Sequence, residues 1–163
     1  MRKDPRSGCA INAAVEVLGD SWSLIVLRDI VFGNRRHFRE ILSLNDEGIA
    51  SNMLSSRLKK LVDEGLLTRA ATVRGQKAAY SLTEAGIQVV PVMVALGAWG
   101  MTHRPTSREL TVRSRILAES PELVRDLMDE LREAHLGVPL PESPRPRASE
   151  RLRAAYEAEF GRA

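Results

Sequence analysis

The stretch IASNMLSSRLKKLVDEGLLTR, residues 49–69, carries the side chains most suited to molecular recognition. Leu54, Leu58 and Leu61 recur at helical spacing and predict a helix over residues 50–64 with one buried side. Before Asp63, the opposite side carries small hydroxyls, an amide and lysines, with no acid. We therefore expect that side to approach a polar, negatively charged partner closely.

These residue types are suited to binding a nucleic acid rather than to catalysis. Asn52 can pair bidentately with adenine, whereas Ser55, Lys59 and Lys60 are suited to phosphates, which set register. The free N–H groups at the amino end of such a helix offer further phosphate contacts. The predicted contacts on this helix are Ser51, Asn52, Ser55, Ser56, Arg57, Lys59 and Lys60.

Basic residues outside this helix extend the same chemistry. LLTRAATV and AAYSL flank the turn RGQK and predict a β-hairpin, whose Arg69, Arg74 and Lys77 would reach a phosphate backbone or minor groove. Arg36 and Arg39, on the preceding short helix, could clamp phosphates. Residues 1–80 hold 13 Lys+Arg against 9 Asp+Glu, so a polyanion should bind this half, although ordinary surface charge remains the alternative.

Periodicity predicts the elements that position these residues. Helices over 10–18, 22–32 and 36–44 precede the helix at 50–64, and the apolar positions of the second surround most of its axis, so it should be central and buried. Ser21 should cap that second helix, and Thr83 should cap another over residues 84–101. With residues 66–82 as the wing, this order predicts a winged helix-turn-helix fold, mainly α with a small β-hairpin.

The remaining chain predicts a helical C-terminal extension. A helix over 120–136 starts with a Ser120 cap and Pro121 and ends at Gly137. Residues 138–147 form a proline-rich linker, and an amphipathic helix follows over 149–160. We expect residues 1–103 to form a DNA-binding and dimerisation domain. Residues 104–163 could extend a dimer, cover a small-molecule pocket or simply pack outside.

The helix GIQVVPVMVALGAWG, residues 86–100, has apolar positions too widely distributed for one buried face. One side can cover the domain while the other meets a partner chain. Pro91 removes an internal hydrogen bond and should bend this helix. A monomer's core helix is the alternative. The predicted dimer interface consists of Val90, Met93, Val94 and Trp99.

Composition argues against several other classes of protein. The chain has 163 residues, of which 44% are hydrophobic and 28% charged, as in ordinary globular proteins. The amino end lacks a signal-peptide pattern, and the apolar stretch VVPVMVALGAW is too short to span a bilayer, so we predict a cytoplasmic protein. His37, His103 and His135 lack the paired spacing of a zinc site, and no Gly-rich phosphate loop occurs. We predict neither an enzyme nor a cofactor or metal.

Residues 9–100 resemble the HxlR-type winged helix-turn-helix transcriptional regulators, relatives of the MarR-like group. The matching stretches occur in family order, namely Cys9, VLGDSWSLIVLRDIVFG, RHFREIL, GIASNMLSSRLKKLVDEGLLTR, YSLTEAG and VVPVMVALGAWG. The resemblance implies homodimers that bind near-palindromic double-stranded DNA operators, with a recognition helix starting at GIAS. It places Asn52, Ser55 and Arg57 at DNA-facing or phosphate-contacting positions. The helical wheel, however, puts Arg57 near the buried edge, where it could brace the helix instead.

Cys9 has two interpretations. Some members of the family sense oxidants or electrophiles with an amino-terminal cysteine, and Cys9 matches that position. The dipole of the first helix and nearby Arg6 would favour its thiolate. A small side chain without a regulatory role is the alternative.

Together these patterns predict a transcriptional regulator that binds its operator as a homodimer and is controlled by a small effector or by modification of Cys9. A winged-helix module that binds proteins, without sequence-specific DNA binding, is the alternative function.

Overall fold

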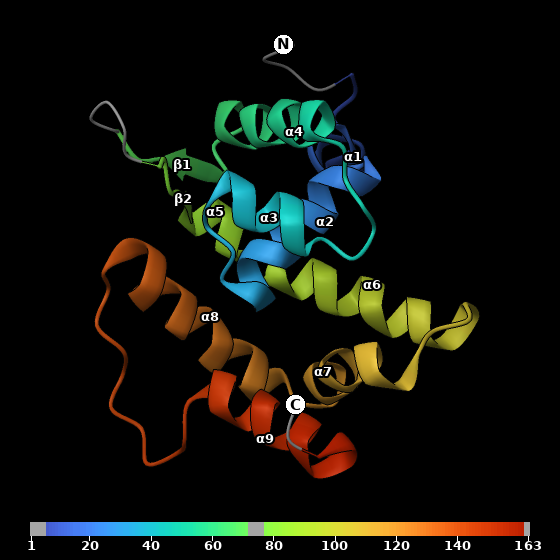
Figure 1. Ribbon diagram of the computed structural model, residues 1–163, viewed down its shortest axis with the longest axis vertical. Coiled ribbons are helices and arrows are strands. Elements are labelled where there is room, and N and C mark those ends of the chain that lie inside the picture. Colours follow the sequence, from blue (N-terminus) through green and yellow to red (C-terminus); the bar gives the residue numbers. More distant parts are fainter. Residues whose placement is uncertain (1–5, 72–76, 162–163) are drawn as a thin grey trace. The chain divides into compact units, whose positions relative to one another are not determined.

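The structure is a computed structural model that describes residues 6–71 and 77–161. The chain divides into two compact units, Met1–Thr83 and Glu84–Ala163. Helices dominate both units, and a two-stranded antiparallel sheet lies in the first (Figure 1). The predicted fold class, mainly α with a small β-hairpin, is confirmed.

The first unit has the element order of a winged helix-turn-helix. Its elements are α1 (Ala10–Leu18), α2 (Ser21–Gly33), α3 (Phe38–Leu44), α4 (Ser51–Asp63), β1 (Leu67–Arg69) and β2 (Tyr80–Leu82). The strands pair with Leu67 opposite Leu82 and Arg69 opposite Tyr80. This register puts Leu67, Tyr80 and Leu82 in the core and leaves Arg69 exposed.

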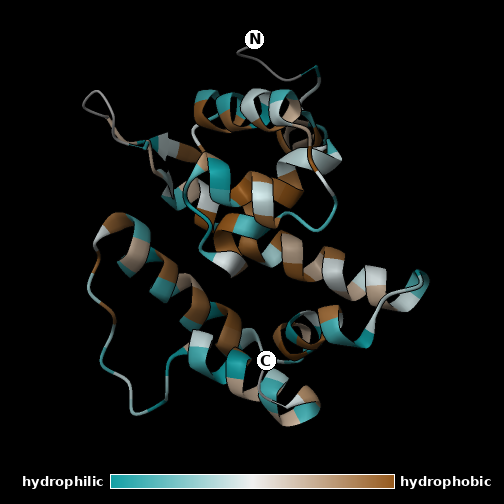
Figure 2. Ribbon diagram, viewed as in Figure 1, coloured by the Kyte–Doolittle hydropathy of each residue, from teal (hydrophilic) through white to brown (hydrophobic). Residues whose placement is uncertain are grey.

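The core of the first unit forms where α2 packs against α4. Val26, Leu27 and Ile30 of α2 are completely buried, as are Leu54 and Leu61 of α4. Figure 2 shows that α4 carries hydrophilic residues alongside these hydrophobic ones. The prediction that α2 is a central, buried helix is confirmed, and α4 has one buried side, as its leucine spacing indicates.

The cap of α2 differs from the prediction. Asp20, not Ser21, is the N-cap, because Asp20 has an extended backbone and its carboxylate accepts a hydrogen bond from the Ser23 N–H. Ser21 is already the first helical residue. The carboxylate at residue 20 therefore lies at the start of α2, where the helix dipole stabilises negative charge.

The second unit consists of α5 (Glu84–Ile87), α6 (Val90–His103), α7 (Arg108–Glu119), α8 (Pro121–Leu136) and α9 (Ala148–Phe160). Helix α7 packs against α6 and α9, while α8 packs against α9 and α5. Ser120 caps α8 and Gly137 ends it in a left-handed conformation, as predicted. The second unit begins at Glu84, and within it α6 packs with α7.

Two helix predictions in the second unit were wrong or incomplete. The predicted helix over 84–101 is interrupted at Gln88 and Val89, and Pro91 lies in the first turn of α6, where no helical hydrogen bond is lost. Proline therefore marks a helix start rather than a bend. Helix α7 was not predicted, although Ser107 is its N-cap and accepts a hydrogen bond from the Leu110 N–H.

The apolar segment over α5 and α6 is longer than the sequence analysis allowed. Among the described residues, Glu84–His103 is long and apolar enough to cross a membrane, with a mean hydropathy of 1.5 and 22% of the apolar window buried. The bent pair α1–α2 meets the same criterion, with 77° between its helices. The run VVPVMVALGAW is only the central part of this segment, which extends to Glu84 and to His103.

The packing of α2 on α4 predicts a strong effect of truncating Leu58, which is only 1% exposed. Leu58→Ala should lower the free energy of unfolding by about 2–5 kcal/mol, because a buried cavity replaces the side chain. Leu44→Ala is the matched control, since Leu44 is 53% exposed, and it should change stability by less than about 1 kcal/mol. Urea denaturation followed by circular dichroism measures both, and equal losses would contradict this account of the core.

Candidate nucleic-acid interface

Helix α4 presents a small polar surface opposite its buried leucines. Ser51, Asn52, Ser55, Ser56 and Lys59 are exposed. Lys59 is 76% exposed and pairs with Asp63 at 2.6 Å within the same helix. This surface is narrow and free of acid in its first turn, so it fits the chemistry of base edges and phosphates.

The amino end of α4 lacks a side-chain cap. Ala50 occupies the N-cap position with extended backbone and cannot accept a hydrogen bond through its methyl group. The Asn52 side-chain Oδ1 accepts from the Met53 N–H at 2.8 Å, so one donor of the first turn is already occupied. An anion at this end would therefore meet backbone donors that the cap residue leaves uncapped.

Asp20 binds two of the basic side chains predicted to contact phosphate. Its Oδ1 accepts from Arg57 Nε at 2.7 Å, and its Oδ2 accepts from Lys60 Nζ at 2.8 Å. Burial opposes ionisation of this carboxyl, but hydrogen bonds from Lys60 and Ser23 dominate and hold the pKa of Asp20 well below its usual range. Lys60 was expected to point away from the fold, whereas it lies against the start of α2.

Arg36 contacts the wing. Its Nε donates to the Tyr80 carbonyl at 3.2 Å, and its guanidinium also donates to Ser81 Oγ. The Tyr80 N–H donates to the Arg36 carbonyl at 2.8 Å, and His37 Nδ1 lies 3.2 Å from the Ala78 carbonyl. Arg36 therefore fixes β2 to the segment before α3, a structural role that sequence spacing did not indicate.

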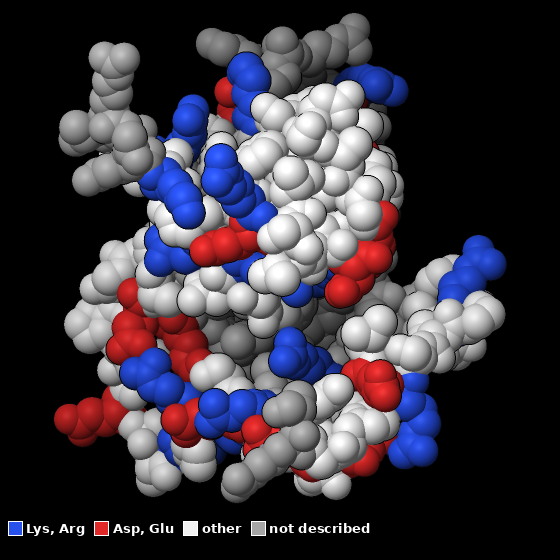
Figure 3. All heavy atoms as spheres, in the orientation of Figure 1, with Lys and Arg blue, Asp and Glu red and all other residues white. Residues whose placement is uncertain are grey.

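Other predicted basic contacts are exposed. Arg39 on α3, Arg69 on β1 and Lys77 before β2 are all accessible to solvent. Arg74 lies outside the described residues. Figure 3 shows Lys and Arg side chains gathered on the first unit beside its strands. The exposed cations and the polar surface of α4 belong to one unit.

A buried acid before α4 was not predicted. Asp29 is 4% exposed; Arg28 and Arg35 pair with it at 2.8 and 3.4 Å, and Asn45 Nδ2 donates to it at 3.0 Å. Arg28 also binds Glu47, and Asn45 Oδ1 accepts from the Ile49 N–H at 3.0 Å. This cluster fixes the turn that leads into α4. The sequence offered one indication of this cluster, namely the single acid among the apolar residues of α2.

The apolar face of α6 differs from the predicted dimer interface. Val90 is completely buried within the chain, and Met93 and Val94 are partly buried, whereas Trp99 is 55% exposed. Val92 and Leu96, at 44% and 49% exposure, continue the surface of Trp99 at helical spacing. Val90 thus offers no free surface to a partner. In the first unit, Ile11 and Val15 of α1 are also exposed.

Cys9 is exposed at the N-cap of α1. Its N–H donates to Ser7 Oγ at 3.4 Å. Arg6 pairs with Glu16 at 3.6 Å, so its charge is shared with a carboxylate. The thiol is accessible to solvent, and the nearby Arg6 is engaged by Glu16.

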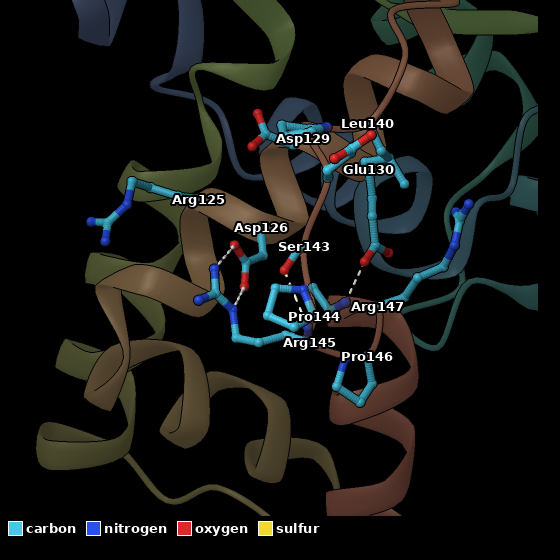
Figure 4. A pocket seen from close by; sticks show the side chains of 13 residues that line it. Arg125, Asp126, Asp129, Glu130, Leu140, Ser143, Pro144, Arg145, Pro146 and Arg147 are labelled. Atoms are coloured by element: carbon cyan, nitrogen blue, oxygen red, sulfur yellow. Dashed lines mark hydrogen bonds and ion pairs between the residues drawn. The ribbon is translucent and has the colours of Figure 1, made fainter.

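A cavity of about 510 Å³ lies in the second unit between α8 and residues 140–148. Figure 4 shows Arg145 bound to Asp126, and Glu130 bound to the N-terminus of α9. Arg147 pairs with Glu133 at 2.7 Å. These ion pairs fasten the proline-rich segment to α8, and they give the cavity a charged lining. Within the described residues, no three His, Cys, Asp or Glu side chains are grouped to hold a metal ion.

Helices α2 to α4 followed by a paired strand hairpin define a winged helix-turn-helix protein, the class to which many DNA-binding regulators belong. The family model for the HxlR-like helix-turn-helix matches residues 17–108, which is more than half of the chain. The protein belongs to the HxlR-like helix-turn-helix family of transcriptional regulators.

Named relatives agree with this assignment. The chain is 36% identical to the HTH-type transcriptional regulator Rv3095 of Mycobacterium tuberculosis over 99 residues, 60% of this chain and 61% of the relative. It thus matches less than two thirds of that relative's length. It is 29% identical to YdeP of Bacillus subtilis over 102 residues, 62% and 78% of the two chains. The crystal structure of PA1607, described as a candidate transcription factor, matches with a TM-score of 0.56 and 29% identity over 63% of this chain and 70% of that one.

The Asp20 contacts predict a pH-dependent contribution to stability. Asp20→Asn keeps a capping oxygen but loses the charge, so it should cost about 1–2 kcal/mol at pH 7. Because the folded pKa of Asp20 is depressed, the contribution is complete above the unfolded pKa of about 4 and is lost as pH falls toward the folded pKa. The difference in unfolding free energy between the two proteins should therefore shrink below about pH 4. Urea titrations at several pH values measure it, and a constant difference would contradict this role.

Proposed function

We propose that this regulator binds a near-palindromic double-stranded DNA operator as a homodimer, with α4 in the major groove and residues 66–82 on the backbone or minor groove. The observation that carries this proposal is the surface of α4, where small polar side chains are exposed opposite a fully buried leucine side. Such a surface suits a major groove, because its amide and hydroxyl groups can hydrogen-bond base edges and phosphates, and its first turn carries no acid to repel the phosphates.

The exposed residues have separate roles in this proposal. Asn52 reads a base edge, while Ser51, Ser55, Ser56 and Lys59 contact phosphates beside it. Arg39, Arg69 and Lys77 extend the phosphate contacts beyond α4, and the same role is proposed for Arg74. Arg36, Arg57 and Lys60 position the wing and α4, in keeping with their contacts to Ser81 and Asp20.

Dimerisation is proposed through apolar surface that the chain leaves exposed. Val92, Leu96 and Trp99 form a stripe on α6, and Ile11 and Val15 form another on α1. The exposed apolar side chains of α6 need either a partner chain or a lipid phase to cover them. The family assignment supports a partner chain, in a cytoplasmic protein. Residues 1–103 then comprise the DNA-binding and dimerisation domain, and residues 104–163 comprise its extension.

Control by a small effector or by Cys9 is a further part of the proposal. The exposed thiol is accessible to oxidants, and without a second cysteine it would form an adduct or an intersubunit disulfide. The cavity beside α8 has a volume within the range of ligand sites, about 300–1,000 Å³, and its charged lining suits a polar effector. A coupling of about 1–3 kcal/mol would change operator affinity 5- to 150-fold.

The direct test is fluorescence anisotropy on the DNA upstream of the protein's own gene, with scrambled DNA as competitor. The operator should be preferred, and log affinity should fall linearly with log salt between about 50 and 200 mM. Lys59→Ala should weaken binding to both DNAs and reduce the salt slope by about one, whereas Asn52→Ala should reduce mainly the preference for the operator. Equal, weak binding to this DNA and to genome-selected fragments would favour the alternative, a winged-helix module that binds proteins.

The dimer proposal predicts that one charge on the α6 stripe separates the subunits. Trp99→Glu should convert the dimer to monomers in sedimentation equilibrium, because a charged carboxylate would replace the largest apolar side chain of the stripe. Leu136→Glu is the matched control, since Leu136 on α8 is 41% exposed and lies outside the stripe, and it should remain dimeric. An unchanged mass for Trp99→Glu would place the interface elsewhere.

A further inference from the structure

The carboxylate of Asp20 is fully occupied by hydrogen bonds. Oδ1 accepts from the Ser23 N–H at 2.9 Å and from Arg57 Nε at 2.7 Å. Oδ2 accepts from Ser23 Oγ at 2.6 Å and from Lys60 Nζ at 2.8 Å. The Asp20 carboxylate therefore caps α2 and also binds two side chains in the middle of α4. It adds directional contacts between two helices that otherwise meet through apolar side chains.

Asp20 also divides the basic side chains of α4 into two kinds. The side chains of Arg57 and Lys60 are 24% and 25% exposed, whereas that of Lys59 is 76% exposed. Arg57 Nη1 additionally lies 3.3 Å from Ser56 Oγ, which keeps the guanidinium along the helix. Two of the three cations are thus held against the protein, and only Lys59 extends into solvent.

This division bears on DNA selectivity. Phosphate contacts supply nearly all of the affinity for non-specific DNA, and each adds about 0.9 to the salt slope. Base contacts from a helix require that its tilt and depth in the groove be fixed. A carboxylate that keeps two cations away from the DNA, and also fixes the helix, would lower the affinity for non-specific DNA. It would preserve the contacts of the helix with bases.

We propose that Asp20 is a specificity-determining positioning residue, which holds Arg57 and Lys60 on the protein and thereby favours the operator over other DNA. The inference rests on the proposed DNA-binding function. Asp20 itself contacts no DNA. Its effect is exerted through the two cations and through the orientation of α4.

The test compares Asp20→Asn and Asp20→Ser with the wild-type protein, on operator and on scrambled DNA, by anisotropy over a salt series. Both side chains retain an N-cap oxygen, so α2 stays capped while the charge is lost. The affinity for scrambled DNA should rise about tenfold, its salt slope should steepen by about one to two, and the operator preference should fall at least about tenfold.

Asp63→Asn is the matched control. It frees Lys59 from an ion pair on the same helix without touching α2, and it should change the operator preference less than about threefold. Adding Lys60→Gln to Asp20→Asn removes a freed cation and should return scrambled-DNA binding toward the wild-type value.

The outcomes separate the two proposals. If wild-type protein prefers the operator and the Asp20 variants keep that preference and salt slope, the role of Asp20 is refuted while the DNA-binding function stands. An equal effect of Asp63→Asn would refute it too. If the wild-type protein shows no preference for any operator, the proposed function fails and this inference fails with it.

Discussion

The ion-pair contact between Asp20 and α4 is the interaction on which the proposed recognition surface depends. The leucine side of α4 fixes which face is buried, but the hydrophobic effect is itself non-directional. Hydrogen bonds from Arg57 and Lys60 to one carboxylate add direction. Because the same carboxylate caps α2, the position of α4 is set by the helix at the centre of the core. The Asp29 cluster completes this arrangement by fixing the turn before α4.

The elements of the first unit could largely be predicted from sequence, whereas the pairing of its charges could not. Leu54, Leu58 and Leu61 define a helical face by local spacing alone, and the hairpin follows from two short strands around a turn. The partners of Arg36 and Lys60 lie some forty residues away in the chain, at Ser81 and Asp20, so no local pattern reveals them. In a sequence, lysine and arginine on a polar helix face suggest phosphate contacts. In the folded chain, an acid that is distant in sequence can lie beside them and bind them instead.

The second unit was predicted less completely than the first, although α8 and α9 were both expected from their sequences. Pro91 was expected within a helix and instead starts one, and α7 was not predicted. The expected interface on α6 included Val90, which is buried, and omitted Val92 and Leu96, which are exposed. An almost wholly apolar helix does not reveal which of its sides faces its own chain. That choice depends on how α7 and α8 pack, which sequence spacing does not specify.

The most direct test of the central claim is to map where α4 lies on operator DNA. An iron chelate attached to Ser56→Cys, in a Cys9→Ser background, should cleave the operator at two sites in successive major grooves, about 34 Å apart. The same chelate attached to Ser149→Cys on α9 serves as the control and should give a different cleavage pattern or none. Cleavage from residue 56 that is spread evenly along the operator, or that matches the pattern from residue 149, would contradict the assignment of α4 as the recognition helix.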